Sequence, residues 1–375
     1  MNHITIFSAS IGNGHNEASK ALKEQFEKQG ASVSVIDTFQ SIHPLLHKMF
    51  LEMYLTILRL APKIWGRLYR YGGEYSWYLI MDHVGSFFCE RLEAIIKKQN
   101  TTVMISTHPF VTAFLSKLKQ KKQLNIPLYT VITDLGLHPA YIRPEIDGYF
   151  TASPHIESFA KKYNIPVAQC YCTGIPIKTV PDVTIPRSEI REALQLDPHK
   201  KTLLITGGGL GLSRYVEILH YMEQLNQPLQ VLCMTGMNQR VAQKITKVKS
   251  KHSIEVIPFT EKFTSYLRAS DVIISKPGGL TMSEALACET PIIIYDPVPG
   301  HEEQNAELLE EFGTAVKVEF AEEMAPVLDR VLVDKHYYQT MVSNAKKLKK
   351  PDAAKKISDV IHHLEMAKYK KEKTE

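Results

Sequence analysis

The sequence predicts an α/β protein with two Rossmann-like, doubly wound domains that face each other across a cleft. Short apolar runs alternate with helical segments along most of the 375 residues. Each half also has a glycine-containing loop directly after an apolar run, at residues 8–15 and 206–212. A stretch with four prolines, residues 176–200, separates the halves. Buried parallel strands followed by loops and helices produce this alternation, and such sheets bind ligands where their strands end.

The composition is that of a soluble globular protein, with 44% hydrophobic and 23% charged residues. The net charge of +5 is a mild excess, so we expect no nucleic-acid partner. Five cysteines without metal-ligand spacing indicate a reducing compartment rather than a disulfide framework. We see no signal peptide and no apolar run of the roughly 20 residues that cross a bilayer.

The first half begins with a predicted strand at Ile4–Phe7, a loop, a helix over Asn16–Gln29 and a strand over Ala31–Asp37. Further strands are expected near residues 103–106, 127–133, 149–152 and 169–173, with helices between them. The first loop reads G-x-G-H, which is not the full G-x-G-x-x-G dinucleotide fingerprint. Although Asp37 stands where a ribose-binding carboxylate would, NAD binding is therefore disfavoured.

Residues 44–80 combine aromatic, basic and apolar side chains. The segment holds both tryptophans of the chain, and its five lysines and arginines outnumber its two acids. Such a segment suits the headgroup region of an anionic membrane, although a pair of core helices would show a similar apolar stripe. The candidate acceptor and membrane residues here are Trp65, Arg67, Tyr69 and Arg70.

The second half begins with a predicted strand at 202–205, and its most informative stretch is 271–305. The apolar run 272–274 leads into Ser275-Lys276-Pro277-Gly278-Gly279, with a helix opening near Thr281. A glycine turn feeding a helix N-terminus binds anions through backbone N–H groups, and Lys276 adds a positive charge. A second strand, 291–295, is followed by polar residues 301–305, so the stretch suits a nucleotide-sugar.

An ordered set of motifs along residues 4–345 resembles one enzyme family. The motifs are Gly12-Asn13-Gly14-His15 with Ala18, Thr133-Asp134, Thr173-Gly174-Ile175-Pro176, Lys276-Pro277-Gly278-Gly279, Glu284-Ala285 and Pro299-Gly300-His301-Glu302-Glu303-Gln304-Asn305. They are similar to those of the processive diacylglycerol glucosyltransferases and the plant monogalactosyldiacylglycerol synthases. The resemblance implies a GT-B fold and an inverting glycosyltransferase that moves a hexose from UDP-glucose or UDP-galactose to a diacylglycerol-like lipid.

The resemblance also implies residue roles. His15 matches the general base that takes a proton from the acceptor hydroxyl, and Asp134 is expected to orient that imidazole or to contact the acceptor. A loop cap for His15, and a turn or N-cap for Asp134, are the structural alternatives. The expected donor-binding residues are Gly14, Gly208, Gly209, Lys276, Pro277, Gly278, Gly279, Glu284, Glu303, Gln304 and Asn305.

Among these, Glu284 matches the carboxylate that binds ribose, and Gln304 and Asn305 match positions that bind sugar hydroxyls. Helix-start capping is the plain alternative for the last two. The chain has no Asp-x-Asp motif, so we expect the glycine turns and Lys276 to stabilise the leaving diphosphate, with no metal ion and no cofactor.

We therefore expect an N-terminal acceptor and base domain over 1–174, a C-terminal UDP-sugar domain over 175–345 and a Lys-rich helix and tail over 346–375. The expected location is cytoplasmic, peripheral on the inner face of the membrane. His301 and Asn13 depart from some relatives, which leaves glucose and galactose both open. A non-hydrolysing UDP-sugar epimerase and a non-catalytic UDP-sugar sensor are the competing functions.

Overall fold

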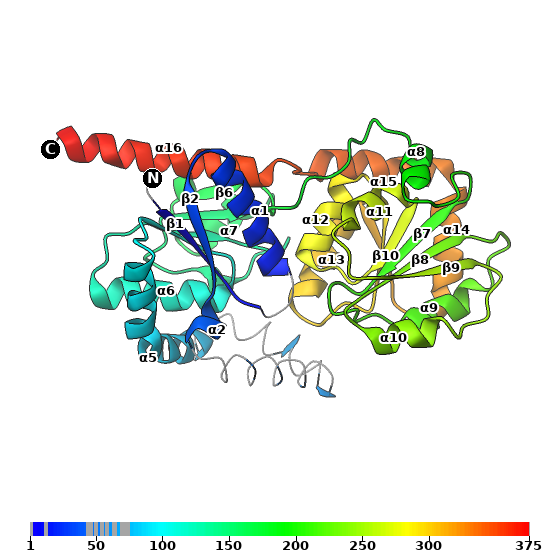
Figure 1. Ribbon diagram of the computed structural model, residues 1–375, viewed down its shortest axis with the longest axis horizontal. Helices are drawn as coiled ribbons and strands as arrows, with labels where there is room; N and C mark the ends of the chain where they lie inside the picture. Colours follow the sequence, from blue (N-terminus) through cyan, green and yellow to red (C-terminus); the bar gives the residue numbers. More distant parts are fainter. Residues whose placement is uncertain are drawn as a thin grey trace. The chain divides into compact units, whose positions relative to one another are not determined.

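The computed structural model describes residues 3–10, 14–42 and 76–374, with isolated positions 48, 52, 56, 60, 61, 66 and 67. The chain divides into two compact units, each containing a six-stranded parallel sheet between layers of helices (Figure 1). The first unit comprises residues 1–177, 299–301 and 352–375, and the second comprises 178–298 and 302–351. Together with the similar solved structures reported below, these two sheets confirm the predicted α/β fold class.

The first sheet has the strand order β2-β1-β3-β4-β5-β6. Its strands are β1 (His3–Ser8), β2 (Ser32–Asp37), β3 (Val103–Ser106), β4 (Leu128–Val131), β5 (Gly148–Thr151) and β6 (Cys170–Cys172). The helices of this unit are α1 (Gly14–Lys28), α2 (Thr38–Ile42), α5 (Ser76–Lys98), α6 (Pro109–Lys122), α7 (Ile156–Lys162) and α16 (Ala353–Thr374), with short 3₁₀ turns η1 (Pro139–Tyr141) and η2 (Val167–Gln169).

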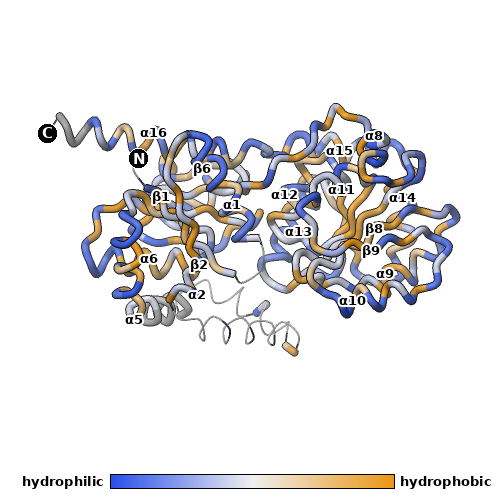
Figure 2. Tube along the Cα trace, viewed as in Figure 1, coloured by the Kyte–Doolittle hydropathy of each residue, from blue (hydrophilic) through white to orange (hydrophobic). Residues whose placement is uncertain are grey.

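Side chains alternate across the first sheet into two apolar clusters. On one face, Ile4 and Ile6 of β1 pack with Leu22 and Phe26 of α1. On the other face, Phe7 and Met104 pack with residues of α5 and α6. Strands β1 and β3 are buried along nearly their whole length, as expected for central strands of a parallel sheet covered on both sides. Figure 2 shows hydrophobic segments, in orange, among the strands of both units.

Helix α16 belongs to the first unit although it is the last element of the chain. Ile357 and Ile361 are fully buried in the cluster formed by β1 and α1. Two polar contacts support this packing: Gln29 Nε2 donates to Asp359 at 2.8 Å, and the Tyr129 hydroxyl donates to Glu365 at 2.6 Å. The C-terminal helix that the sequence suggested as a separate segment thus completes one face of the first sheet.

The second sheet has the order β12-β11-β10-β7-β8-β9. Its strands are β7 (Thr202–Thr206), β8 (Gln230–Gly236), β9 (Ser253–Pro258), β10 (Val272–Ser275), β11 (Ile292–Tyr295) and β12 (Ala315–Val318). Its helices are α8 (Arg187–Ala193), α9 (Tyr215–Met222), α10 (Gln239–Ile245), α11 (Phe263–Ala269), α12 (Gly279–Ala287), α13 (His301–Glu311), α14 (Met324–Val333) and α15 (Lys335–Leu348), with η3 (Ala321–Glu323) before α14. One large apolar cluster joins α9, α10 and α14 to the strands.

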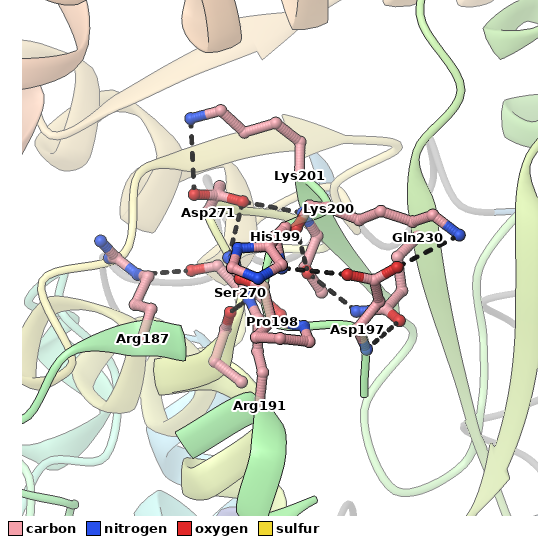
Figure 3. Close-up of polar contacts among 12 residues, drawn as sticks. Arg187, Arg191, Asp197, Pro198, His199, Lys200, Lys201, Gln230, Ser270 and Asp271 are labelled. Atoms are coloured by element: carbon pink, nitrogen blue, oxygen red, sulfur yellow. Dashed lines mark hydrogen bonds and ion pairs between the residues drawn. The ribbon is translucent and has the colours of Figure 1, made fainter. Parts of the chain in front are cut away.

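A buried ion pair fastens the amino-terminal edge of this second sheet (Figure 3). Arg191 Nη2 contacts Asp271 Oδ2 at 2.8 Å, and the same oxygen accepts from the backbone N–H of Thr202 at 2.7 Å. Arg191 Nε also donates to the carbonyl of Ala269, where α11 ends. Both charges are buried and hydrogen-bonded, so loss of either side chain would leave the other charge unpaired. This network lies at the edge opposite the strand ends that carry the predicted donor loops.

Candidate active site

In the first unit, a candidate site lies where the strand order of the sheet reverses. Successive strands run from β1 outward to β2 on one side and to β3 on the other. Loops diverge at such a point, leaving room for a ligand beyond the carboxyl ends of the strands. His15 follows β1, while Thr107 and His108 follow β3. The topology therefore places His15 where a ligand is expected.

Two hydrogen-bond partners fix the orientation of His15. Its Nδ1 lies 2.8 Å from the carbonyl oxygen of Thr107 and 2.7 Å from the hydroxyl of Thr133. A carbonyl oxygen can only accept a hydrogen bond, so Nδ1 must carry a proton. In the neutral ring, Nε2 then holds the lone pair. This is the tautomer that a general base needs.

The electrostatic surroundings keep His15 neutral near pH 7. Burial lowers its pKa below the usual 6.5, and this effect outweighs the neighbouring Asp134 carboxylate and the Thr107 hydrogen bond, which both raise it. Asp134 is half-buried and directly follows Thr133 in the loop after β4. The pKa of Tyr141 is raised, first by burial and then by the Asp134 charge. Asp134 thus influences His15 electrostatically; a direct role in catalysis stays a prediction.

His108 supports His15 and was not among the residues that the sequence indicated. Its ring packs edge-on against the His15 ring, with 4.6 Å between the ring centroids. His108 Nδ1 accepts from the backbone N–H of Phe110 at 3.2 Å, which caps α6. Burial, and then the neighbouring His15, hold the pKa of His108 well below 6.5. A histidine directly before Pro109 was visible in the sequence, but its packing partner was not.

Gly14 and the residues around it connect the first loop to the sheet. Gly14 is the first residue of α1. Two residues later, the Asn16 side chain accepts from Ser8 and donates to Ser10, each at 2.8 Å. Asp37 accepts from the Ser10 hydroxyl and from the backbone N–H of Gln40. The Asp37 carboxylate, considered above for ribose binding, therefore holds the first loop in place and caps the start of α2.

The second unit has a candidate site of its own at the corresponding point of its sheet, where the order reverses between β7 and β10. The loop after β7 is a compact glycine turn: Gly211 N–H donates to Gly208 and Leu212 N–H to Gly207. Gly208 and Gly211 have positive φ of 69° and 59°, and a Cβ on Gly211 would lie 2.1 Å from the carbonyl oxygen of Thr235. This loop requires glycine there because the backbone passes so close to β8. Gly209 also lies in it, and its carbonyl accepts from the N–H of Met237 at 3.1 Å.

The turn after β10 leads directly into α12. Gly278 is the N-cap residue of this helix and no side chain caps it; Gly279 is the first helical residue. A Cβ added to Gly278 would meet only a carboxylate oxygen of Glu302, at the ordinary van der Waals distance of 3.9 Å. N–H groups at a helix start can bind an anion, which is the role that the sequence predicted for this turn. The carbonyl of Pro277 in this turn accepts from Asn305 Nδ2 at 2.9 Å.

The carboxylate and amide residues of α12 and α13 differ in their surroundings. Glu284, on α12, is buried with 6% exposure. Asn305 is fully buried and holds the Pro277 carbonyl, so it positions the glycine turn. Gln304 Oε1 is buried and has no hydrogen-bond partner among the described residues, and such an atom usually marks an absent partner. Glu303 lies beside it in the first turn of α13.

Lys276 lies at the end of β10, with Nζ 3.4 Å from Asp296 Oδ2.

Of the residues predicted to contact the acceptor or the membrane, Arg67 is exposed, whereas Trp65, Tyr69 and Arg70 lie outside the described residues. Among the helices that the structure describes, none combines the length and the apolar character of a membrane span. Within the same described ranges, no group of three or more His, Cys, Asp or Glu side chains is arranged to hold a metal ion.

Solved structures with this architecture identify the fold. MurG from Acinetobacter baumannii aligns with a TM-score of 0.63 and 18% identity, covering 97% of this chain and 100% of that chain. HepE from Anabaena in complex with UDP-glucose aligns with a TM-score of 0.55 and 12% identity, covering 97% and 100%. Two parallel sheets with this likeness define a GT-B glycosyltransferase fold.

Sequence comparisons then identify the family. The profile of monogalactosyldiacylglycerol (MGDG) synthase matches residues 15–177, and the glycosyltransferase family 28 C-terminal domain matches residues 202–357. A processive diacylglycerol beta-glucosyltransferase from Bacillus cereus (strain 03BB102) is 31% identical, over 96% of this chain and 94% of the relative. The chain belongs to this glycosyltransferase family, which confirms the resemblance found in the sequence.

Proposed function

We propose that this protein transfers a hexose from a UDP-sugar to a hydroxyl group of diacylglycerol or of a glycosyl-diacylglycerol, with inversion at the anomeric carbon. The acceptor class follows from the names of its relatives, the MGDG synthases and diacylglycerol glucosyltransferases. The donor class is supported by HepE, a fold neighbour whose structure contains UDP-glucose. The observation that carries the proposal is the contact of His15 Nδ1 with the Thr107 carbonyl oxygen, from which we infer that the lone pair is on Nε2.

In the proposed reaction, His15 Nε2 takes the proton of the acceptor hydroxyl as that oxygen bonds to the anomeric carbon. The bond from this carbon to the diphosphate oxygen breaks, and its electron pair leaves with UDP. Attack from the side opposite the leaving group inverts the configuration. The mechanism requires the first unit to supply the base and the second unit the donor site during turnover.

The second unit contains groups suited to each part of the donor. The N–H groups at Gly278 and Gly279, together with Lys276, suit the developing diphosphate charge. Glu284 is our candidate for the ribose hydroxyls, as its buried carboxylate can accept two hydrogen bonds. A sugar hydroxyl would supply the partner that Gln304 Oε1 lacks. Because these groups can together stabilise the diphosphate charge and bind the ribose and the sugar, we propose that transfer needs no metal ion. EDTA treatment should therefore leave the rate unchanged.

The decisive experiment incubates the protein with radiolabelled UDP-glucose or UDP-galactose and with vesicles containing diacylglycerol, and then extracts labelled lipid. Label in the lipid phase that depends on diacylglycerol supports the proposal and identifies the hexose. An epimerase would instead convert the UDP-sugar without any acceptor, and a sensor would bind UDP without turnover. Either result would refute a lipid transferase.

We further propose that the protein acts as a peripheral protein on the anionic inner face of the cell membrane. The basic and aromatic residues of segment 44–80, with the exposed Arg67 among them, support this location. Sedimentation with anionic and with neutral vesicles tests it: binding to anionic vesicles that weakens with salt is expected. Equal binding to both kinds, or none, would count against an electrostatic contact.

A further inference from the structure

Three charged side chains from neighbouring strands meet at the carboxyl edge of the second sheet. Arg214 ends the glycine loop after β7, Lys276 follows β10, and Asp296 follows β11. In the sheet, β10 lies between β11 and β7. Arg214 and Lys276 therefore lie at the point where the strand order reverses, beside the two glycine turns of the candidate donor site, and Asp296 lies one strand further along the sheet.

Both cations contact the same carboxylate oxygen. Arg214 Nε lies 3.3 Å from Asp296 Oδ2, and Lys276 Nζ lies 3.4 Å from that oxygen. The two nitrogens can therefore be no further apart than these two distances combined. A single diphosphate group is long enough to contact both.

Arg214 keeps hydrogen-bonding capacity for a ligand. Its Nη1 also pairs with Glu217 at 3.4 Å, one turn along α9. A guanidinium carries five N–H donors in a planar fork that matches phosphate oxygens, so donors remain after these two contacts. The Arg214 side chain is 56% exposed, which leaves it accessible from solvent.

Asp296 holds its position through an unusual backbone conformation. Its φ of 55° lies in the left-handed region, which costs a residue other than glycine about 1 kcal/mol or more and often marks a functional position. An ion pair with a side chain as exposed as Arg214 contributes only about 0–1 kcal/mol of stability, so that pair alone does not offset the cost of this backbone conformation. A carboxylate that holds two cations together at a strand end is better explained as part of an anion-binding site.

We propose that Arg214 is a second cation for the diphosphate of the nucleotide-sugar, beside Lys276, and that Asp296 positions both. This inference rests on the proposed function, because it assigns a further residue to the same donor site. It does not depend on which base or sugar the donor carries.

The test measures binding of UDP, inorganic pyrophosphate and uridine by calorimetry or competition. Arg214→Ala should weaken UDP and pyrophosphate binding about tenfold, the loss expected for one charged hydrogen bond, and should leave uridine binding unchanged. Arg214→Lys should restore part of the affinity because it restores charge but not the fork. Lys335→Ala is the matched control: it removes an equal charge from an exposed residue at the start of α15 and should have no effect.

Asp296→Asn separates positioning from simple charge. Asparagine tolerates the same φ and has the same shape, and the change removes a negative charge near the phosphates. Simple electrostatics would then raise UDP affinity, whereas loss of positioning lowers it. We expect the affinity to fall; an unchanged or raised affinity would overturn the role given to Asp296.

The remaining outcomes separate this inference from the proposed function. If pyrophosphate binding depends on Arg214 but no lipid is labelled, the inference stands and the transferase assignment fails. If lipid is labelled while Arg214→Ala binds UDP and pyrophosphate normally, Arg214 is only a surface ion-pair residue. Failure of the wild-type protein to bind either compound would also overturn the inference.

Discussion

The two units prepare chemistry at equivalent points of their sheets by different means. In the first unit the proposed base is a single imidazole, and the Thr107 carbonyl and the Thr133 hydroxyl hold it in one tautomer. In the second unit the proposed donor site consists mainly of backbone, in a glycine loop after β7 and in the helix start at Gly278. The first arrangement suits proton transfer, and the second suits anion binding.

This difference predicts different consequences of substitution. Loss of the proposed base in the first unit should remove turnover but leave donor affinity intact. Substitutions in the second unit should change affinity first. Each prediction below tests whether this division between the units holds.

The largest effect is expected from His15→Ala. Without a base for the acceptor hydroxyl, kcat should fall about 100- to 10,000-fold, while UDP affinity should stay within error. Transfer assays and calorimetry measure the two quantities. His362→Ala, which changes an exposed histidine on α16 of the same unit, should leave both unchanged. A lowered UDP affinity in His15→Ala would contradict the division between the units.

Glu284→Ala should show the opposite pattern. Loss of a buried carboxylate that hydrogen-bonds ribose should weaken UDP binding about 10- to 100-fold. Glu284→Gln keeps the side-chain volume and should also bind weakly, which guards against a misfolded alanine variant. Glu307→Ala, at an exposed position of α13, is the control. Normal UDP affinity in Glu284→Gln would remove Glu284 from the site.

Two glycines of the second unit test whether its backbone binds the donor or only folds tightly. A methyl group at Gly278 would make only an ordinary van der Waals contact with Glu302, so Gly278→Ala should keep the melting temperature but weaken UDP binding about tenfold. At Gly207 a Cβ would lie 2.5 Å from the backbone nitrogen of Leu212, so Gly207→Ala should destabilise the unit by about 1–3 kcal/mol. Normal UDP affinity in a folded Gly278→Ala would exclude this turn as the anion site.

The sequence was informative where local pattern alone decides structure. The strand at 272–274 and the glycine turn after it are found at β10 and Gly278, because a short apolar run followed by glycines has few other conformations. The strand β12 (Ala315–Val318) was missed: its run Ala-Val-Lys-Val is short and contains a lysine. An edge strand needs only one apolar face, so its pattern is weak.

Contacts between distant residues could not be predicted from local patterns. His15 was found from its motif, but the Thr107 carbonyl that fixes its tautomer lies 92 positions away in the chain. Arg214 and Asp296 share an ion pair only because β7, β10 and β11 lie side by side in the sheet. Likewise, α16 looked like a tail, since the burial of Ile357 and Ile361 depends on strands at the other end of the sequence.

The smallest effect is expected from Asp134→Asn, measured as the pH dependence of kcat/KM. His15 must be neutral to act as a base, so the rate should fall as the pH drops through its pKa, which burial places below 6.5. The Asp134 charge raises that pKa, so its removal lowers the pKa further and should move the acid limb of the profile to lower pH. Glu27→Gln, near the far end of α1, should not move the limb. An acid limb unchanged in Asp134→Asn would mean that Asp134 does not tune the base, and its role would then be confined to loop structure or acceptor contact.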